Sequence, residues 1–169
     1  MAIVLVVEDG TGLADANCYC DLAFLETHSE YSGDDISSYT DEQKNSAIYV
    51  AANKYIDRLH EFDGNKINAD QGMKLYTDLV SFDDASKDIM QANAEAAILQ
   101  LKGFLFVSAE TQSASGDVKV LATELDVLKK STEYFENTSI TTKYNTSTID
   151  ALLKPYLKAG SNGVKLVVM

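Results

Sequence analysis

Apolar residues recur at helical spacing along much of the chain, and this pattern predicts a mainly helical protein. The clearest case is one face made of Ile48, Ala51, Ala52, Tyr55, Ile56 and Leu59. Thr40 and Gln43 stand before it in the spacing of a capping box. We therefore expect a helix that begins at Thr40 and ends near His60. A weaker helical pattern covers residues 70–79.

Two further helices are predicted in the first two thirds of the chain. One covers about residues 16–29, with Asp15 or Asn17 as its N-cap. A second pattern starts between residues 83 and 86, continues to about residue 105, and is rich in alanine. Its apolar residues surround the helix almost completely, which is typical of a helix buried by several neighbours or by another subunit.

The last predicted helix covers residues 147–157, with Ser147 or Thr148 as its cap. Pro155 is the only proline and lies inside this pattern. Proline lacks a backbone N–H and clashes with the preceding turn, so it should kink or end the helix.

Short apolar runs predict strands at both ends of the chain and in one internal region. The internal candidates are residues 118–121, 125–128 and 132–135. The terminal runs, residues 2–7 and 164–169, each contain about five large apolar side chains, and leaving either in water forgoes on the order of 10 kcal/mol. Each run must therefore pair with the other, with the domain, or with a partner by strand addition.

We expect one helical domain over residues 1–159, followed by a docking tail at residues 160–169. The tail begins with Gly160, Ser161, Asn162 and Gly163, which form a hinge. Such a hinge favours a partner for the apolar run that follows it. No repeat or interdomain linker is visible in the sequence.

The charge of the chain changes the list of possible partners. The net charge is −12 over 169 residues, and Arg58 is the only arginine. DNA-binding proteins gain affinity by neutralising phosphates with clustered lysine and arginine. The sequence therefore argues against tight DNA contact, although a local basic patch remains open. It contains no apolar run of the length required of a transmembrane helix, and its start lacks the basic region of a signal peptide.

Candidate catalytic and metal-binding residues are few. Cys18 and Cys20 fall on the first predicted helix, where they point to different faces, so we expect reduced thiols and an intracellular chain. His28 and His60 belong to no metal motif. Asp9 with Gly10, Thr11 and Gly12 reads as a turn capped by Asp9. We predict no enzyme site, no cofactor and no metal.

Five segments together resemble a known family. They are VEDGTGLADANCY, NSAIYVAANKYIDRLHEFDGNK, DIMQANAEAAILQLKG, VKVLATELDVLKKSTEY and STIDALLKPYL, which cover residues 7–19, 45–66, 88–103, 118–134 and 147–157. In this order they resemble the head–tail adaptor (head-completion or connector) proteins of tailed bacteriophages. Members of that group often carry a DnaT-like single-stranded-DNA-binding label.

The resemblance implies a mainly α fold, a bundle of four to five helices with a small β-hairpin and extended apolar ends. It implies a ring of twelve copies in the virion neck, reached from the host cytoplasm. The ring would bind the portal protein, extend the channel through which double-stranded DNA passes without tight binding, and receive the next neck or tail-terminator protein. No membrane is involved. An acidic ring suits this role, because DNA must pass without sticking.

The resemblance and the pattern together suggest three sets of site residues. Portal docking is expected at the tail residues Val164, Lys165, Leu166, Val167, Val168 and Met169. Subunit contacts are expected at Ile3, Leu5, Val7, Met90, Ala94, Ala97 and Leu101. Residues that face the channel or the DNA would be Lys119, Lys129 and Lys130.

Two other functions stay open at this point. A single-stranded-DNA-binding replication protein would bind oligonucleotides in a strongly salt-dependent way, first through the three lysines just named. A tail-completion ring protein would share the assembly logic and differ in its partner.

Overall fold

A computed structural model of the chain describes residues 3–106, 118–124, 129–134 and 146–159, with only the backbone of the two internal strands. The described part is mainly helical, as the sequence predicts. It divides into two compact units: residues 1–106 with 144–169, and residues 107–143. The predicted division into one domain over residues 1–159 and a docking tail stays a prediction.

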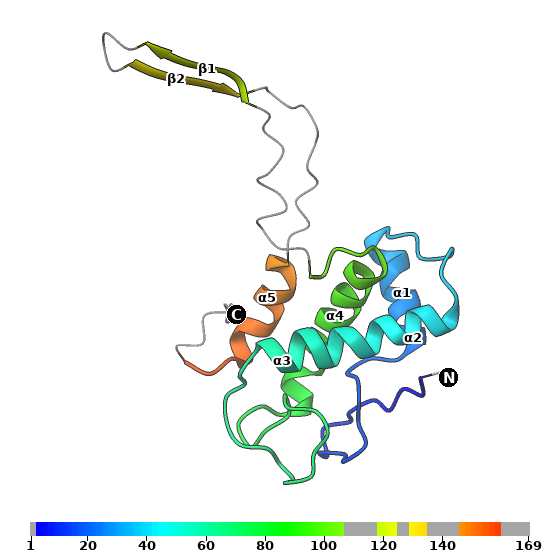
Figure 1. Ribbon diagram of the computed structural model, residues 1–169. Coiled ribbons are helices and arrows are strands. Elements are labelled where there is room, and N and C mark those ends of the chain that lie inside the picture. Colours follow the sequence, from blue (N-terminus) through cyan, green and yellow to red (C-terminus); the bar gives the residue numbers. More distant parts are fainter. Residues whose placement is uncertain (1–2, 107–117, 125–128, 135–145, 160–169) are drawn as a thin grey trace. The chain divides into compact units, whose positions relative to one another are not determined.

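Four helices make up the described part of the first unit (Figure 1). Their bounds are α1 Leu22–Ser32, α2 Asp41–Val50 continued by the π-helix η1 Ala51–Ile56 and by α3 Asp57–Leu59, α4 Phe82–Leu101, and α5 Ser147–Leu153 continued by the 3₁₀ turn η3 Lys154–Tyr156. The prediction allowed four or five helices. The fifth, at residues 70–79, is wrong, because this segment is an irregular loop.

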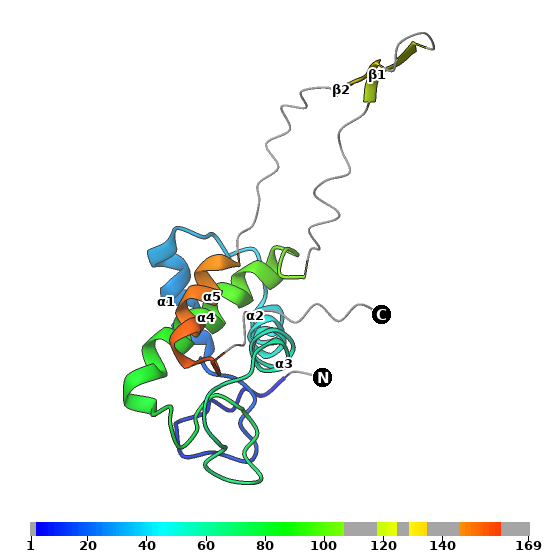
Figure 2. The same cartoon turned by 90° about the vertical axis from the view of Figure 1, so that its left-hand side faces the viewer.

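Helix α4 is the centre of the bundle. It packs against α1, α2, η1 and α5, and Figures 1 and 2 show these helices around it. Its alanines let the neighbouring backbones approach closely, and Ala85, Ala92, Ala94, Ala96 and Ala97 are fully buried. The sequence predicted that several neighbours or another subunit would bury this helix, and the neighbours that bury these alanines belong to its own chain.

The ends of several helices follow the chemistry of their residues. The capping box before α2 is confirmed: the Thr40 hydroxyl accepts a hydrogen bond from the Gln43 N–H, and the Gln43 side chain accepts one from the Thr40 N–H. The effect of Pro155 is also confirmed, since the α-helix ends at Leu153 and the proline lies in a 3₁₀ turn. Helix α4 begins after the cap Ser81 and ends earlier than predicted, just before the left-handed Gly103.

Helix α1 begins six residues later than the sequence predicts. Its N-cap is Asp21, which accepts a hydrogen bond from the Phe24 N–H, whereas Asp15 and Asn17 were expected. Asn17 does not cap a helix because its side chain binds the backbone of Val4 and Val6. Residues 16–20 therefore run beside the N-terminal segment, and the two cysteines precede the helix.

The N-terminal segment is extended but does not form a regular strand. Val7 makes an isolated parallel bridge with Cys18, and no longer ladder is formed by residues 3–7. The predicted strand at residues 2–7 is to this extent wrong. Its side chains alternate nonetheless: Leu5 and Val7 pack against the core, and Val4 is 77% exposed.

The second unit contains two antiparallel strands, β1 Val118–Glu124 and β2 Lys129–Tyr134. Thr123 pairs with Lys130 and Glu124 with Lys129, and the register is irregular between Val118 and Val120. Both strands overlap segments that the sequence marks as extended. The predicted strand at residues 125–128 lies outside the described residues.

Candidate functional site

The motif at residues 7–19 is organised by one buried carboxylate. Glu8 is only 1% exposed, and its Oε1 accepts hydrogen bonds from the N–H groups of Gly10 (3.0 Å) and Gly12 (2.9 Å). Its Oε2 accepts one from the Leu13 N–H at 3.1 Å. Three backbone donors thus converge on Glu8, so its charge is used to hold the loop and not to react.

The glycines of this motif are required by the geometry of the same loop. Gly10 and Gly12 have φ of 88° and 77°, in the left-handed region that glycine tolerates. A Cβ on Gly10 would lie 2.4 Å from the Cβ of Phe82. The predicted turn cap is confirmed, because Asp9 Oδ1 accepts hydrogen bonds from the N–H and hydroxyl of Thr11.

A second buried network joins the N-terminal segment to α3. The Tyr19 hydroxyl donates to Asp57 Oδ1 at 2.5 Å, and the Lys74 N–H donates to Asp57 Oδ2 at 2.9 Å. Burial raises the pKa of Asp57 to about 6, although the hydrogen bonds from Tyr19 and Lys74 act in the opposite direction. This carboxyl is enclosed by its own chain, which suits a structural role.

The buried thiols are poor nucleophiles. Cys18 and Cys20 are free and fully buried. Burial raises the pKa of Cys18 to about 12 and that of Cys20 well above its ordinary value. Among the described residues, no group of three or more histidines, cysteines and carboxylates is arranged to hold a metal ion.

His60 lies in the core and not at an exposed helix end. It is 1% exposed, its Nδ1 lies 3.0 Å from the Ile56 carbonyl oxygen, and its Nε2 lies 3.5 Å from Asp150 Oδ1. The Tyr55 hydroxyl donates to the same Asp150 oxygen at 3.1 Å. This group joins the end of α3 to α5.

The α4 residues expected at subunit contacts differ in how far their own chain covers them. Ala94 and Ala97 are completely buried inside this chain, because α1, α2 and α5 cover the helix, so they are not available to a second copy. Met90 and Leu101 are half-buried and pack on the same core. Their predicted role in subunit contacts stays a prediction.

The N-terminal contacts Ile3, Leu5 and Val7 lie on a segment with one bonded edge. On that edge, Val6 exchanges hydrogen bonds with Asn17, and the Val4 carbonyl accepts one from the Asn17 side chain. The backbone N–H and C=O groups of Leu5 and Val7 face the other way and make no hydrogen bond with a described residue. We call this unpaired side the open edge.

The remaining predicted residues are only partly placed. Lys119 lies on β1, and Lys129 and Lys130 begin β2. The docking residues 164–169 lie outside the described part of the chain.

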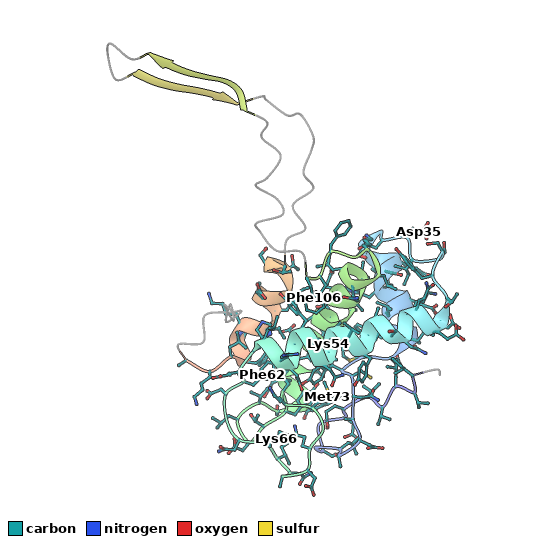
Figure 3. The ribbon with its side chains drawn as sticks, viewed as in Figure 1. Asp35, Lys54, Phe62, Lys66, Met73 and Phe106 are labelled. Carbon is teal, nitrogen blue, oxygen red and sulfur yellow. The ribbon has the colours of Figure 1, made fainter. Side chains whose placement is uncertain are left out.

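A group of lysines that the sequence analysis did not single out lines a small hollow. Lys66, Lys74 and Lys158 lie around about 280 Å³ of space, together with His60, Glu61, Phe62, Gly64 and Thr77. Figure 3 labels Phe62 and Lys66, which come from the segment after α3. We call this space and its lining residues the lysine hollow. The lysines are far apart in sequence and no motif connects them, so only the fold reveals the group.

None of the helices that the structure describes has both the length and the hydrophobicity of a membrane span. A family model described as "Putative DnaT-like ssDNA binding protein" matches residues 3–169. The match covers nearly the whole chain, so the protein belongs to this family. No curated protein and no solved structure matches it.

Proposed function

We propose that this member of the DnaT-like family is a structural virion protein, a ring-forming head–tail adaptor of a tailed bacteriophage. It would bind the portal, extend the DNA channel and offer the docking surface for the next neck protein. The virion neck would be its final location. The proposal rests on the resemblance of the five sequence segments and on features of the fold that suit assembly.

The open edge is the observation that carries the proposal. An extended apolar segment with unpaired backbone groups on one side is a template for strand addition by another chain. Val4 is 77% exposed beside it, so a partner strand would also bury apolar surface. Monomeric proteins usually protect such edges, whereas a subunit of an assembly uses them.

The loop next to the open edge is held by hydrogen bonds from its own side chains, which also supports an assembly role. Residues 7–19 are one of the two more specific parts of the resemblance, and there the side chains of Glu8, Asp9 and Asn17 bind backbone groups of the N-terminal segment. A motif used in this way fixes the position of a surface, and does not prepare a reaction.

The test of portal docking uses deletion of residues 164–169. We expect the shortened chain to keep its far-UV circular dichroism and its melting temperature, and to lose binding to purified portal protein. The full chain and a variant with Lys165→Ala, which keeps the apolar residues, are the controls. A loss of helical signal on deletion would contradict the docking role, because it would make the tail part of the core.

The second candidate function is single-stranded DNA binding, and the description of the matched family favours it. The net charge of −12 opposes it, since the overall field repels a polyanion. The exposed aromatic side chains Tyr31, Phe82 and Phe106 come from three different segments, whereas Tyr19, Tyr55 and Tyr76 are buried. Because these observations oppose single-stranded DNA binding, we propose the adaptor as the first candidate.

A further inference from the structure

We propose that the lysine hollow is a binding site for a phosphate group. The proposal uses other residues than the open edge and the predicted docking tail, and it does not depend on the adaptor function. The argument uses the charge, the positions and the size of the groups that line the hollow.

The fold brings the three lysines together through two backbone bridges. Phe62 pairs with Leu157 in an antiparallel bridge, in which the Lys158 N–H donates to the Glu61 carbonyl at 3.0 Å. Lys66 pairs with Thr77 in another. The segments around residues 62, 77 and 157 are therefore fixed side by side, and the lysines they carry share one hollow.

Two of the ammonium groups are also held in position. Lys66 Nζ donates to the Gln71 carbonyl at 2.8 Å, and Lys74 Nζ donates to the Asp57 carbonyl at 2.6 Å. Each ammonium has three N–H donors, so two remain on each for a ligand. Preorganised donors lose less conformational entropy when they bind.

The charges of these lysines are not neutralised by ion pairs within the described part of the chain. There, the lysines that form ion pairs with carboxylates are Lys44, with Glu26 and Asp41, and Lys102, with Asp34. The Asp57 carboxylate interacts electrostatically with Lys66 and Lys74, so carboxylates offset the three positive charges of the hollow only in part. Glu61 is the one carboxylate that lines the hollow.

The number of donors favours a phosphate group over a carboxylate. A phosphate presents up to four oxygens and as much as two negative charges, enough for three ammonium groups. A carboxylate has two oxygens and one charge. The volume of about 280 Å³ suits a small anion or one group of a chain, and lysine is a common phosphate ligand.

The test is a titration of the whole protein with inorganic phosphate, followed by the backbone amide signals in NMR spectra. We expect the signals of Gly64, Lys66, Thr77 and Lys158 to move, with sodium chloride at equal ionic strength as the reference. The variant with Lys66→Gln and Lys158→Gln leaves Lys74 and its contact with Asp57 in place. It should weaken binding at least about tenfold, since each lost charged hydrogen bond costs that much.

Lys54→Gln is the matched control, because Lys54 is an exposed lysine of η1 that does not line the hollow (Figure 3). This control should bind phosphate as the wild type does, and melting curves check that all variants are folded. Signals that do not move at the hollow, or phosphate binding unchanged in the double variant, would overturn the proposal. An equal response to acetate would also overturn it and would indicate a carboxylate from a protein partner.

The source of the phosphate group is distinguished by a labelled oligothymidylate of about 20 nucleotides, longer than the footprint of a small binding domain. Binding that competes with inorganic phosphate and is lost in the double variant supports the site and identifies a nucleic-acid backbone. Phosphate binding without oligonucleotide binding supports the site and identifies a free phosphate or a phosphomonoester. Neither result depends on whether the chain binds a portal.

Discussion

At the scale of single residues, the buried polar side chains hold loops in place. Glu8, Asp57 and Asn93 are each enclosed and each binds backbone N–H groups of another segment or turn. A buried polar group without its partner costs free energy, so these residues are the sensitive points of the fold. Their chemistry is directed inward, in agreement with a protein that acts through its surfaces.

Replacement of Glu8 by glutamine should destabilise the loop at residues 8–13. The side-chain NH₂ group of glutamine cannot accept the bond that Glu8 Oε2 or Oε1 now accepts, so at least one buried N–H loses its partner. We expect a loss of about 1–3 kcal/mol in the free energy of unfolding, measured by urea denaturation. The control Asp9→Asn, at an exposed position of the same loop, should have a much smaller effect. Equal effects of the two changes would contradict the role of Glu8.

Asp57 should make the stability depend on pH between about 4 and 6. Its pKa is raised from 3.8 to about 6, so the folded state binds the proton more tightly than the unfolded state. Its contribution to stability is therefore greatest below about pH 4 and falls as the pH rises through 6, by at most about 3 kcal/mol.

The measurement is the urea midpoint of the wild type and of Asp57→Asn across this pH range. Carboxyls with lowered pKa, such as Asp34 and Asp78, act in the opposite direction in both proteins, so the difference between the two curves isolates Asp57. The stability of the wild type relative to the variant should decrease from pH 4 to pH 6. A constant difference would show that Asp57 titrates alike in the folded and unfolded states.

At the scale of elements, Asn93 connects three segments at the centre of the bundle. Its Oδ1 accepts hydrogen bonds from the N–H groups of Tyr19 and Cys20, and its Nδ2 donates to the Ile48 carbonyl at 3.2 Å. Helix α4 thus holds both α2 and the segment before α1 by a single side chain. No periodicity of the sequence distinguishes this asparagine from an exposed one.

Asn93→Leu keeps the volume of the side chain and removes these three hydrogen bonds. Since three buried backbone groups lose their partner, we expect the free energy of unfolding to fall by about 2–4 kcal/mol. Gln91→Leu on the same helix, at a half-buried position, should change it by about 0.5 kcal/mol or less. Thermal and urea unfolding of both variants measure this difference. If Asn93→Leu hardly changed the free energy of unfolding, Asn93 would not be the residue that links these elements.

Helices with local signals could be predicted from the sequence, and segments fixed by distant contacts could not. Thr40 and Gln43 cap α2 within four residues, and Pro155 ends α5 within its own turn. Asn17 looks like a helix cap, but the distant partners Val4 and Val6 determine its conformation. The loop at residues 70–79 has a helical pattern, yet Gln71 turns inward to bind the carbonyls of Met73 and Tyr76.

The candidate sites follow the same rule. The open edge could be anticipated from the sequence, because an apolar terminal run must find a partner. The burial of Ala94 and Ala97 within their own chain could not be predicted from the sequence. A helix that is apolar all round gives no sign of whether its own chain or another chain covers it. The lysine hollow depends on two bridges between distant segments, so it became visible only in the fold.

At the scale of the whole molecule, the acidic character and the arrangement in two compact units suit a part of a larger assembly. The net charge of −12 favours passage of DNA over its retention. The open edge offers backbone groups to another chain, and the phosphate site proposed above would add one local exception to the overall charge. Together these features agree with the adaptor function proposed here.

The most direct test is to block production of this protein in the infected host and to examine the particles by electron microscopy. The adaptor function predicts heads that contain DNA or have leaked it, beside complete tails that are not attached. Restoring the protein from a plasmid should restore joined particles. Normal virions, or an arrest of DNA synthesis before any head is filled, would contradict the adaptor function, and the arrest would favour a DNA-binding role.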